Sequence, residues 1–239
     1  MLNEIKDILK IRKKRVISNI PRHIAISIEK ELRSTKNTSL DETYKKRRKI
    51  IKEIIELQIK LNIPIITFFI LSKNSKKSEI FSFLMDEISG FFSELKNYRS
   101  IYKNQVKVSV VGKWYDLPER VVSEIKEVIE STKDYDRFFV NFCVNYDGHE
   151  EIIDACKLIA RQVKSERLDP ESINSEVIKE NLYTSYFISP NLIIQNSDEF
   201  SGILLWDSKD SVIFFTRKQW NSFTKADFMK AIENFQNKN

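Results

Sequence analysis

The sequence predicts an α/β fold in which a largely parallel central sheet of about six strands is flanked by helices. Short runs rich in β-branched and aromatic residues alternate with longer helical patterns along the chain. Most of these runs are apolar throughout, which is typical of strands buried on both faces of a parallel sheet. The predicted strands span residues 23–28, 63–71, 106–111, 137–144, 191–194 and 211–215.

The segments between these strands carry amphipathic helical patterns. Apolar residues recur every three or four positions, so each helix presents one apolar stripe. The stripes comprise Ile80, Leu84, Ile88, Phe91 and Leu95; Ile152, Cys156, Ile159 and Val163; and Phe228, Ile232 and Phe235. Alternating strands and helices predict an open sheet with helices on both faces. We expect one domain over residues 21–239, with an N-terminal helix over residues 1–20 packed on it; attachment of that helix to a membrane surface is the alternative.

Composition limits the class of protein and its partners. A chain of 239 residues that is 41% hydrophobic suits one packed domain, and its net charge of +6 favours anionic partners. No nucleic-acid partner is expected, because no RNA-binding, helix-turn-helix or zinc pattern is present. Cys143 and Cys156 are expected to be core residues in a reducing compartment. Without a signal peptide or a run of about 20 apolar residues, the expected localisation is cytoplasmic, with peripheral contact to the cytoplasmic face of a membrane as an alternative.

Several segments carry motifs whose order and spacing are informative together. Residues 22–33 read RHIAISIEKELR, residues 68–77 read FFILSKNSKK and residues 141–152 read NFCVNYDGHEEI. The C-terminal third contains LYT followed by PNLII, and then LLW and FFT. This series resembles the cis-prenyltransferases, the family of undecaprenyl and dehydrodolichyl diphosphate synthases. The resemblance implies a mixed α/β fold, dimers, and condensation of isopentenyl diphosphate with an allylic diphosphate at a magnesium site.

The resemblance also implies candidate site residues. The candidate catalytic residues are Glu29 and Asn74, and Glu29 and Glu199 are the candidate magnesium ligands. The candidate substrate-binding residues, which would hold isoprenoid diphosphates, are Arg33, Ser72, Lys76, Lys77 and Ser197. Carboxylates suit magnesium, and cations with backbone N–H groups suit diphosphates.

The chain departs from the family pattern at most of the positions that hold phosphate. The family aspartate is Glu29, and the two glycines of the phosphate loop are Lys30 and Leu32. In residues 195–202 the first family arginine is replaced by Gln195, and the second family arginine has no counterpart. The family Arg-x-Gly tail is also absent from residues 235–239. Gln cannot replace the bidentate, always-charged contact of Arg. The loss of several independent parts favours loss of the activity over its adjustment.

Three functions remain open. The first is a catalytically degenerate subunit that forms a homodimer, or a heterodimer with an active cis-prenyltransferase. The second is a divergent active prenyl-diphosphate transferase that uses magnesium. The third is a lipid-binding or interaction protein that uses the cavity where the family holds its hydrophobic chain. Aromatic residues at that position either line the cavity or fill it, and they are Phe68, Phe69, Phe81, Phe83, Phe91 and Phe92. Residues 45–49 form a solvated basic helix face or contact phosphate, and His23 is expected to be structural.

Overall fold

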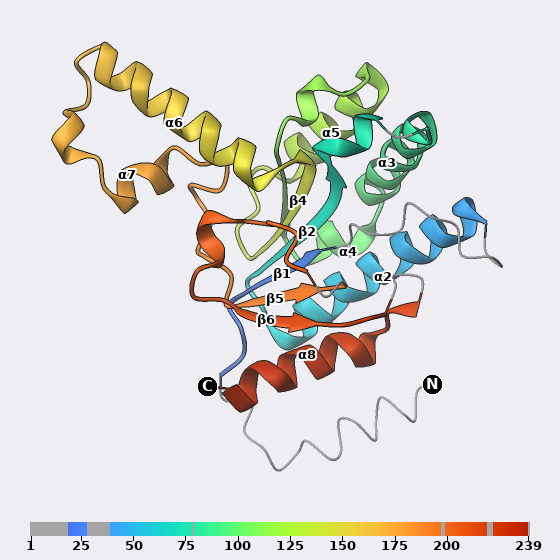
Figure 1. Cartoon of the computed structure of the whole chain (residues 1–239). Helices are drawn as coiled ribbons and strands as arrows, with labels where there is room; N and C mark the ends of the chain where they lie inside the picture. Colours follow the sequence, from blue (N-terminus) through green and yellow to red (C-terminus); the bar gives the residue numbers. More distant parts are fainter. Residues whose placement is uncertain (1–18, 28–38, 78, 197–198, 219–221, 239) are drawn as a thin grey trace.

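The computed structural model describes residues 19–27, 39–77, 79–196, 199–218 and 222–238. Six strands form one sheet in the order β3-β4-β2-β1-β5-β6, and every pair of neighbours is parallel (Figure 1). The strands are β1 (His23–Ser27), β2 (Ile65–Ser72), β3 (Val106–Val111), β4 (Phe138–Tyr146), β5 (Leu192–Gln195) and β6 (Val212–Phe215). Each lies within two residues of its predicted range, so the predicted fold class is confirmed.

Helices connect these strands. The longer ones are α2 (Leu40–Leu61), α3 (Phe81–Lys96), α5 (Glu119–Thr132), α6 (Gly148–Lys164) and α8 (Lys225–Lys238). The shorter ones are α4 (Arg99–Lys103) and α7 (Ser175–Glu180), with 3-10 turns η1 (Lys73–Lys77), η2 (Trp114–Asp116), η3 (Pro170–Ser172) and η4 (Trp206–Ser208). Apolar residues of α2, α3, α5 and α8 form one large core with every second residue of the strands. Since successive strand residues point to opposite faces, these four helices share one face of the sheet.

The other face of the sheet is covered in a different way. Its core is smaller and contains Ala25, Phe69, Cys143 and Ile193 from the strands, packed against apolar residues of the segment between α7 and η4. The expectation of helices on both faces therefore applies only in part, because largely non-helical chain and the start of α6 cover this second face.

Helix α6 runs outward from the sheet, and α7 lies beside it (Figure 1). Its buried residues are Gly148, Glu151, Ala155 and Ile159, a line with the i, i+3, i+4 spacing of one helix face. The prediction that Cys156 is a core residue is wrong, because this position lies beside that line and is exposed. The other cysteine, Cys143, is buried in β4 as expected.

The start of α2 is fixed by a local hydrogen bond. The Ser39 hydroxyl accepts the backbone N–H of Glu42 at 3.2 Å and so satisfies one of the helix's unpaired donors. At the other end, Asn62 adopts the left-handed conformation that stops the helix before β2. These ends set the position of the α2 residues that face α3.

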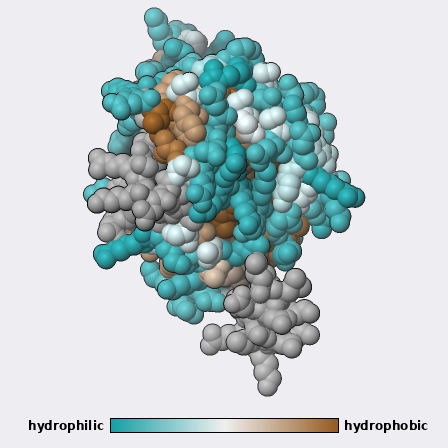
Figure 2. Space-filling view, turned by 90° about the vertical axis from the view of Figure 1, so that its right-hand side faces the viewer, coloured by the Kyte–Doolittle hydropathy of each residue, from teal (hydrophilic) through white to brown (hydrophobic). Residues whose placement is uncertain are grey.

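Some predictions lie outside the described residues. Of the N-terminal helix expected over residues 1–20, only Asn19 and Ile20 are described. Within the described ranges, none of the helices combines the length and the apolar character needed to span a bilayer. The face of the molecule shown in Figure 2 is largely hydrophilic, with smaller hydrophobic areas.

Candidate functional site

The carboxyl ends of β1, β2 and β5 meet at one edge of the sheet. Ser27, the last residue of β1, is in register with Phe69 of β2 and with Gln195 of β5. Ligands of open α/β sheets bind beyond this edge. The chain leaves β1 here into residues 28–38, which carry Glu29 and Arg33 and lie outside the described residues.

Four of the candidate residues lie at the end of β2 and in the 3-10 turn that follows it. The Ser72 hydroxyl accepts the backbone N–H of Asn74 at 3.2 Å, which holds the start of this turn. Asn74, Lys76 and Lys77 are exposed. Neither lysine forms an ion pair within the described part of the chain, so both cations are accessible to an anion at this edge.

A charged network lies at the same edge, and the sequence analysis did not identify it. Lys113, which follows β3, places its Nζ 2.8 Å from Glu150 Oε1 and 2.8 Å from Asp154 Oδ2. Lys73 Nζ lies 2.7 Å from Glu150 Oε2. Hydrogen bonds to Asp154 and Glu150 raise the pKa of Lys113 above its usual range. Burial alone would raise the pKa of Asp154, but hydrogen bonds from Lys113 and Tyr183 hold this pKa below its usual range. The cations of this network are therefore already neutralised by carboxylates.

Gln195 is buried at the end of β5, where the family resemblance predicts an arginine. Only 2% of it is exposed. Its Oε1 accepts hydrogen bonds from the Ser201 hydroxyl at 3.1 Å and from the Ser201 backbone N–H at 3.4 Å. Of the other candidates in this segment, Glu199 is exposed and Ser197 lies outside the described residues. No described part of the chain groups three or more His, Cys, Asp or Glu side chains in a way that could hold a metal ion.

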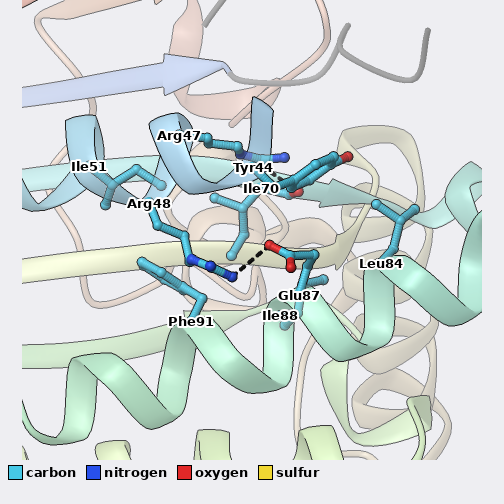
Figure 3. Close-up of a pocket in the computed structure, with 9 residues that line it drawn as sticks. All are labelled: Tyr44, Arg47, Arg48, Ile51, Ile70, Leu84, Glu87, Ile88 and Phe91. Carbon is cyan, nitrogen blue, oxygen red and sulfur yellow. Dashed lines mark hydrogen bonds and ion pairs between the residues drawn. The ribbon is translucent and has the colours of Figure 1, made fainter. Parts of the chain in front are cut away.

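The cavity beside this edge lies between α2 and α3, on the face of the four-helix core (Figure 3). Its volume is about 30 Å³, which accommodates about two water molecules at 10–15 Å³ each. The neighbouring aromatic side chains pack on one another: Phe68, Phe91 and Phe92 all contact the ring of Phe142 with centroids 5.3–5.6 Å apart. Of the two interpretations of the aromatic residues, filling of the cavity is the one that this geometry supports.

The basic segment at the start of α2 does not behave as a uniform solvated face. Lys45, Lys46 and Lys49 are exposed, whereas Arg47 is only 7% exposed. Arg47 donates a hydrogen bond from Nη2 to the Ile70 carbonyl at 2.6 Å. The helical repeat that turns Arg47 inward also turns Arg48 toward α3. The sequence analysis did not predict this orientation of Arg48.

A second buried network anchors α6 to the body of the protein. Glu151, 1% exposed, accepts the Tyr146 hydroxyl at 2.5 Å and both the backbone N–H and the hydroxyl of Thr184 at 3.2 Å. The Thr184 hydroxyl also lies 2.9 Å from Asp207, whose Oδ2 pairs with Lys179 at 2.6 Å. Because every carboxylate here has partners within the fold, this network is structural.

The same fold occurs in solved structures of prenyl diphosphate synthases. Residues 32–239 match the prenyltransferase family model, described as an undecaprenyl diphosphate synthase. Since the match spans most of the chain, this protein belongs to the undecaprenyl diphosphate synthase family.

Curated relatives support the same assignment. The chain is 33% identical over 226 residues to a tritrans,polycis-undecaprenyl-diphosphate synthase (geranylgeranyl-diphosphate specific) of Methanocaldococcus jannaschii, covering 91% of this chain and 81% of the relative. It is 31% identical to an isoprenyl transferase of Thermotoga maritima, covering 90% of this chain and 94% of the relative.

Solved structures share the fold. Lavandulyl diphosphate synthase from Lavandula x intermedia, in complex with dimethylallyl diphosphate, superposes with a TM-score of 0.84 at 25% identity and covers 91% of this chain and 95% of its own. An undecaprenyl diphosphate synthase of Campylobacter jejuni superposes with a TM-score of 0.72 at 24% identity, over 92% of this chain and 97% of its own.

Proposed function

We propose that this chain is a catalytically degenerate subunit that pairs with an active cis-prenyltransferase in polyprenyl diphosphate synthesis. The observation that carries the proposal is Gln195 at the carboxyl edge, a buried neutral amide bonded to Ser201. Arg offers a permanent charge and parallel donors that match a phosphate, and Gln offers neither. A contact to a charged group contributes about 1.5–3 kcal/mol, so its absence weakens diphosphate binding by one order of magnitude or more.

Two further features support the proposal. Lys73 and Lys113 at the same edge are held by Glu150 and Asp154, and so offer little free positive charge to a diphosphate. The cavity between α2 and α3, at about 30 Å³, has room for about two waters and none for a growing isoprenoid chain.

The projecting α6 and α7 supply a surface on which a second subunit can dock. Ile153 and Leu158 on α6 are 51% and 42% exposed, and Tyr186 and Ile188, which follow α7, are 63% and 41% exposed. Large apolar side chains exposed on a projecting helix are candidates for a protein contact. We name the exposed α6 residues Ile153 and Leu158 the α6 patch and assign it the homodimeric or heterodimeric contact.

The partner role is tested with purified chains. Magnesium-dependent incorporation of labelled isopentenyl diphosphate onto an allylic primer is measured for this chain alone, for the intact cis-prenyltransferase of its own cell, and for the mixture. We expect no product from this chain alone and a changed rate or product length in the mixture. Full activity of this chain alone contradicts degeneracy, and an unchanged mixture from which no complex can be isolated contradicts the partner role.

The docking surface has its own test. The double variant I153D/L158D places two carboxylates on the patch and is expected to abolish the complex, measured by light scattering, while leaving the circular dichroism spectrum unchanged. Lys126 on α5 is exposed and lies outside the patch, so K126D is the matched control and is expected to keep the complex. If the I153D/L158D variant still associates with wild-type affinity, the subunit contact lies on another surface.

The second candidate function is a divergent active transferase, favoured by the synthase relatives at 33% identity. In this alternative Arg33, Ser72, Lys76, Lys77 and Ser197 bind the diphosphates, Asn74 assists catalysis, and Glu29 and Glu199 hold magnesium. Magnesium prefers such carboxylates and supplies charge neutralisation of the leaving diphosphate when bound. Of these two magnesium ligands, only Glu199 lies within the described residues, and it is exposed. The described residues therefore supply only part of a magnesium site.

The transferase alternative makes a sharp prediction. Product formation by the isolated chain would require magnesium and would be lost in E29A and strongly reduced in E199A. Product formation that is indifferent to E29A excludes this assignment of roles.

The localisation proposed for the subunit is cytoplasmic, with peripheral membrane contact as the alternative. The net charge of +6 supports attraction to an anionic surface, and both cysteines are free thiols. Co-sedimentation with vesicles containing anionic lipid tests the membrane contact, and protein that stays in the supernatant at low salt contradicts it.

A further inference from the structure

The cavity between α2 and α3 is apolar except where charged side chains cross it. Tyr44 and Ile51 line it from α2, and Leu84 and Phe91 line it from α3. On α2, Arg48 lies four residues after Tyr44 and three before Ile51, so it shares their face. On α3, Glu87 lies between Leu84 and Phe91 on the same face. At both positions the helical repeat calls for an apolar residue, and the chain supplies a charge.

These two charges meet in the middle of the cavity. Arg48 Nη1 lies 2.6 Å from Glu87 Oε2, and the dashed line in Figure 3 runs from one helix to the other. Tyr44 and Leu84 lie to one side of this bridge, and Ile51 and Phe91 lie to the other. The two side chains are only 16% and 12% exposed. The ion pair therefore lies across the largely apolar space between α2 and α3, which we call the passage.

An apolar chain that entered this passage would have to separate the pair and bury both charges. Breaking a poorly solvated ion pair leaves an uncompensated charge and costs several kcal/mol. At about 0.8 kcal/mol per buried CH₂, this cost of several kcal/mol cancels the gain from burying about four to six carbons, so the pair weakens the binding of any apolar chain that reaches it. The space that remains, about 30 Å³, holds about two waters.

We propose that the Arg48–Glu87 ion pair closes the passage between α2 and α3 to isoprenoid chains. The choice of an isoprenoid probe rests on the proposed function, but the closure itself rests on the geometry of the passage. The pair is thus a specificity-determining element that keeps the subunit free of the polyprenyl chain handled by its partner.

The proposal is tested by binding of isoprenoid alcohols, which lack a diphosphate and so do not depend on the phosphate-binding residues or on a partner chain. Equilibrium dialysis with tritiated geraniol, farnesol and geranylgeraniol is carried out on the wild-type chain and on R48A/E87A. We expect no saturable binding of farnesol or geranylgeraniol to the wild type, and at least tenfold tighter binding to the double variant. The gain should be larger for farnesol than for geraniol, because the longer chain reaches past the position of the pair.

The control is a second interhelical ion pair of the same length. Lys96 Nζ on α3 lies 2.6 Å from Glu127 Oε2 on α5 and does not line the passage. K96A/E127A is expected to bind as the wild type does. If K96A/E127A gains as much isoprenoid affinity as R48A/E87A, the gain comes from general loosening of the helix packing, and the proposal is overturned.

A milder variant covers the case in which R48A/E87A does not fold. In E87A, Arg48 keeps a partner, because its Nε lies 3.4 Å from Glu94 Oε1. E87A is expected to bind farnesol at least tenfold more tightly than the wild type. The proposal is overturned if the wild type binds farnesol saturably and as tightly as the variants, or if folded E87A or R48A/E87A gains no affinity. None of these readings depends on catalysis or on subunit pairing, so failure of the proposed function is distinguished from failure of this closure.

Discussion

Lowering the pH from 7.5 to 4 is expected to destabilise this protein through His23. The ring lies in the core with 1% exposed. Its Nδ1 lies 2.6 Å from the Ile188 carbonyl and so carries the proton that it donates. Nε2 accepts the Thr67 hydroxyl at 2.8 Å, and Asn141 Nδ2 donates to the same Thr67 oxygen at 3.1 Å. This chain of hydrogen bonds fits the neutral ring, because a proton on Nε2 would face the hydrogen of the Thr67 hydroxyl.

The magnitude follows from the pKa. Burial lowers the pKa of His23 from 6.5 to about 4, while the Ile188 hydrogen bond opposes the shift. As the pH falls, the unfolded chain therefore binds the proton first, and the folded state loses stability between pH 6.5 and about 4. A difference of about 2.5 pH units at about 1.4 kcal/mol per unit gives a loss of about 3 kcal/mol.

The assay compares two chains so that other titrating groups cancel. Urea unfolding of the wild type and of His23→Gln at pH 7.5, 6, 5 and 4 gives the difference in unfolding free energy, which should change by about 3 kcal/mol in favour of the variant as the pH falls. His149→Gln, at a side chain that is 81% exposed, controls for the substitution and should stay within about 0.5 kcal/mol of the wild type at pH 7.5. A pH-independent difference between wild type and His23→Gln, or an NMR titration of the His23 ring with a midpoint above pH 6, would refute the reasoning.

Substitutions at Gly148, Gly90 and Glu151 give the remaining predictions. Gly148→Ala should lower the unfolding free energy by about 2 kcal/mol or more, because the added Cβ would lie 2.2 Å from the Gly202 carbonyl oxygen. Gly90→Ala should instead stabilise α3 by about 0.5–1 kcal/mol, because its Cβ would meet nothing closer than 3.9 Å. Equal effects of the two substitutions in urea unfolding would contradict this contrast. Glu151→Ala should cost about 3 kcal/mol by leaving buried donors such as the Thr184 N–H without an acceptor, and a loss below 1 kcal/mol would show that water replaces the carboxylate.

The sequence predicted the parallel sheet because burial on both faces leaves a local pattern. Residues 65–71 are buried without interruption, and so are residues 192–195. Apart from Thr67 and Gln195, every residue of these runs is apolar, which makes the runs visible in the sequence. Helix faces were predicted less completely. In α6 the repeat placed Cys156 inside, but the buried line passes through Glu151 and Ala155, because Glu151 is kept in the core by donors that are distant in sequence.

Part of the candidate site was also accessible from sequence. Ser72, Asn74, Lys76 and Lys77 were predicted as site residues because residues 68–77 resemble a family motif, and the 3-10 turn holds Asn74, Lys76 and Lys77 together. The network around Lys113 was missed because its carboxylate partners lie on α6, which is adjacent only once β3 and β4 pair.

By itself, the sequence predicted the strands and the amphipathic helices, since both depend on residue type at local positions. The absence of the phosphate-binding arginines and glycines is what the family resemblance implies. The tertiary structure decided that the passage between α2 and α3 is closed. Arg48 and Glu87 are 39 residues apart in the chain, and each alone looks like a surface charge on an amphipathic helix. Hydrophobic periodicity fixes which side of a helix turns inward, but only the packing of α2 against α3 brings the two charges within hydrogen-bond distance.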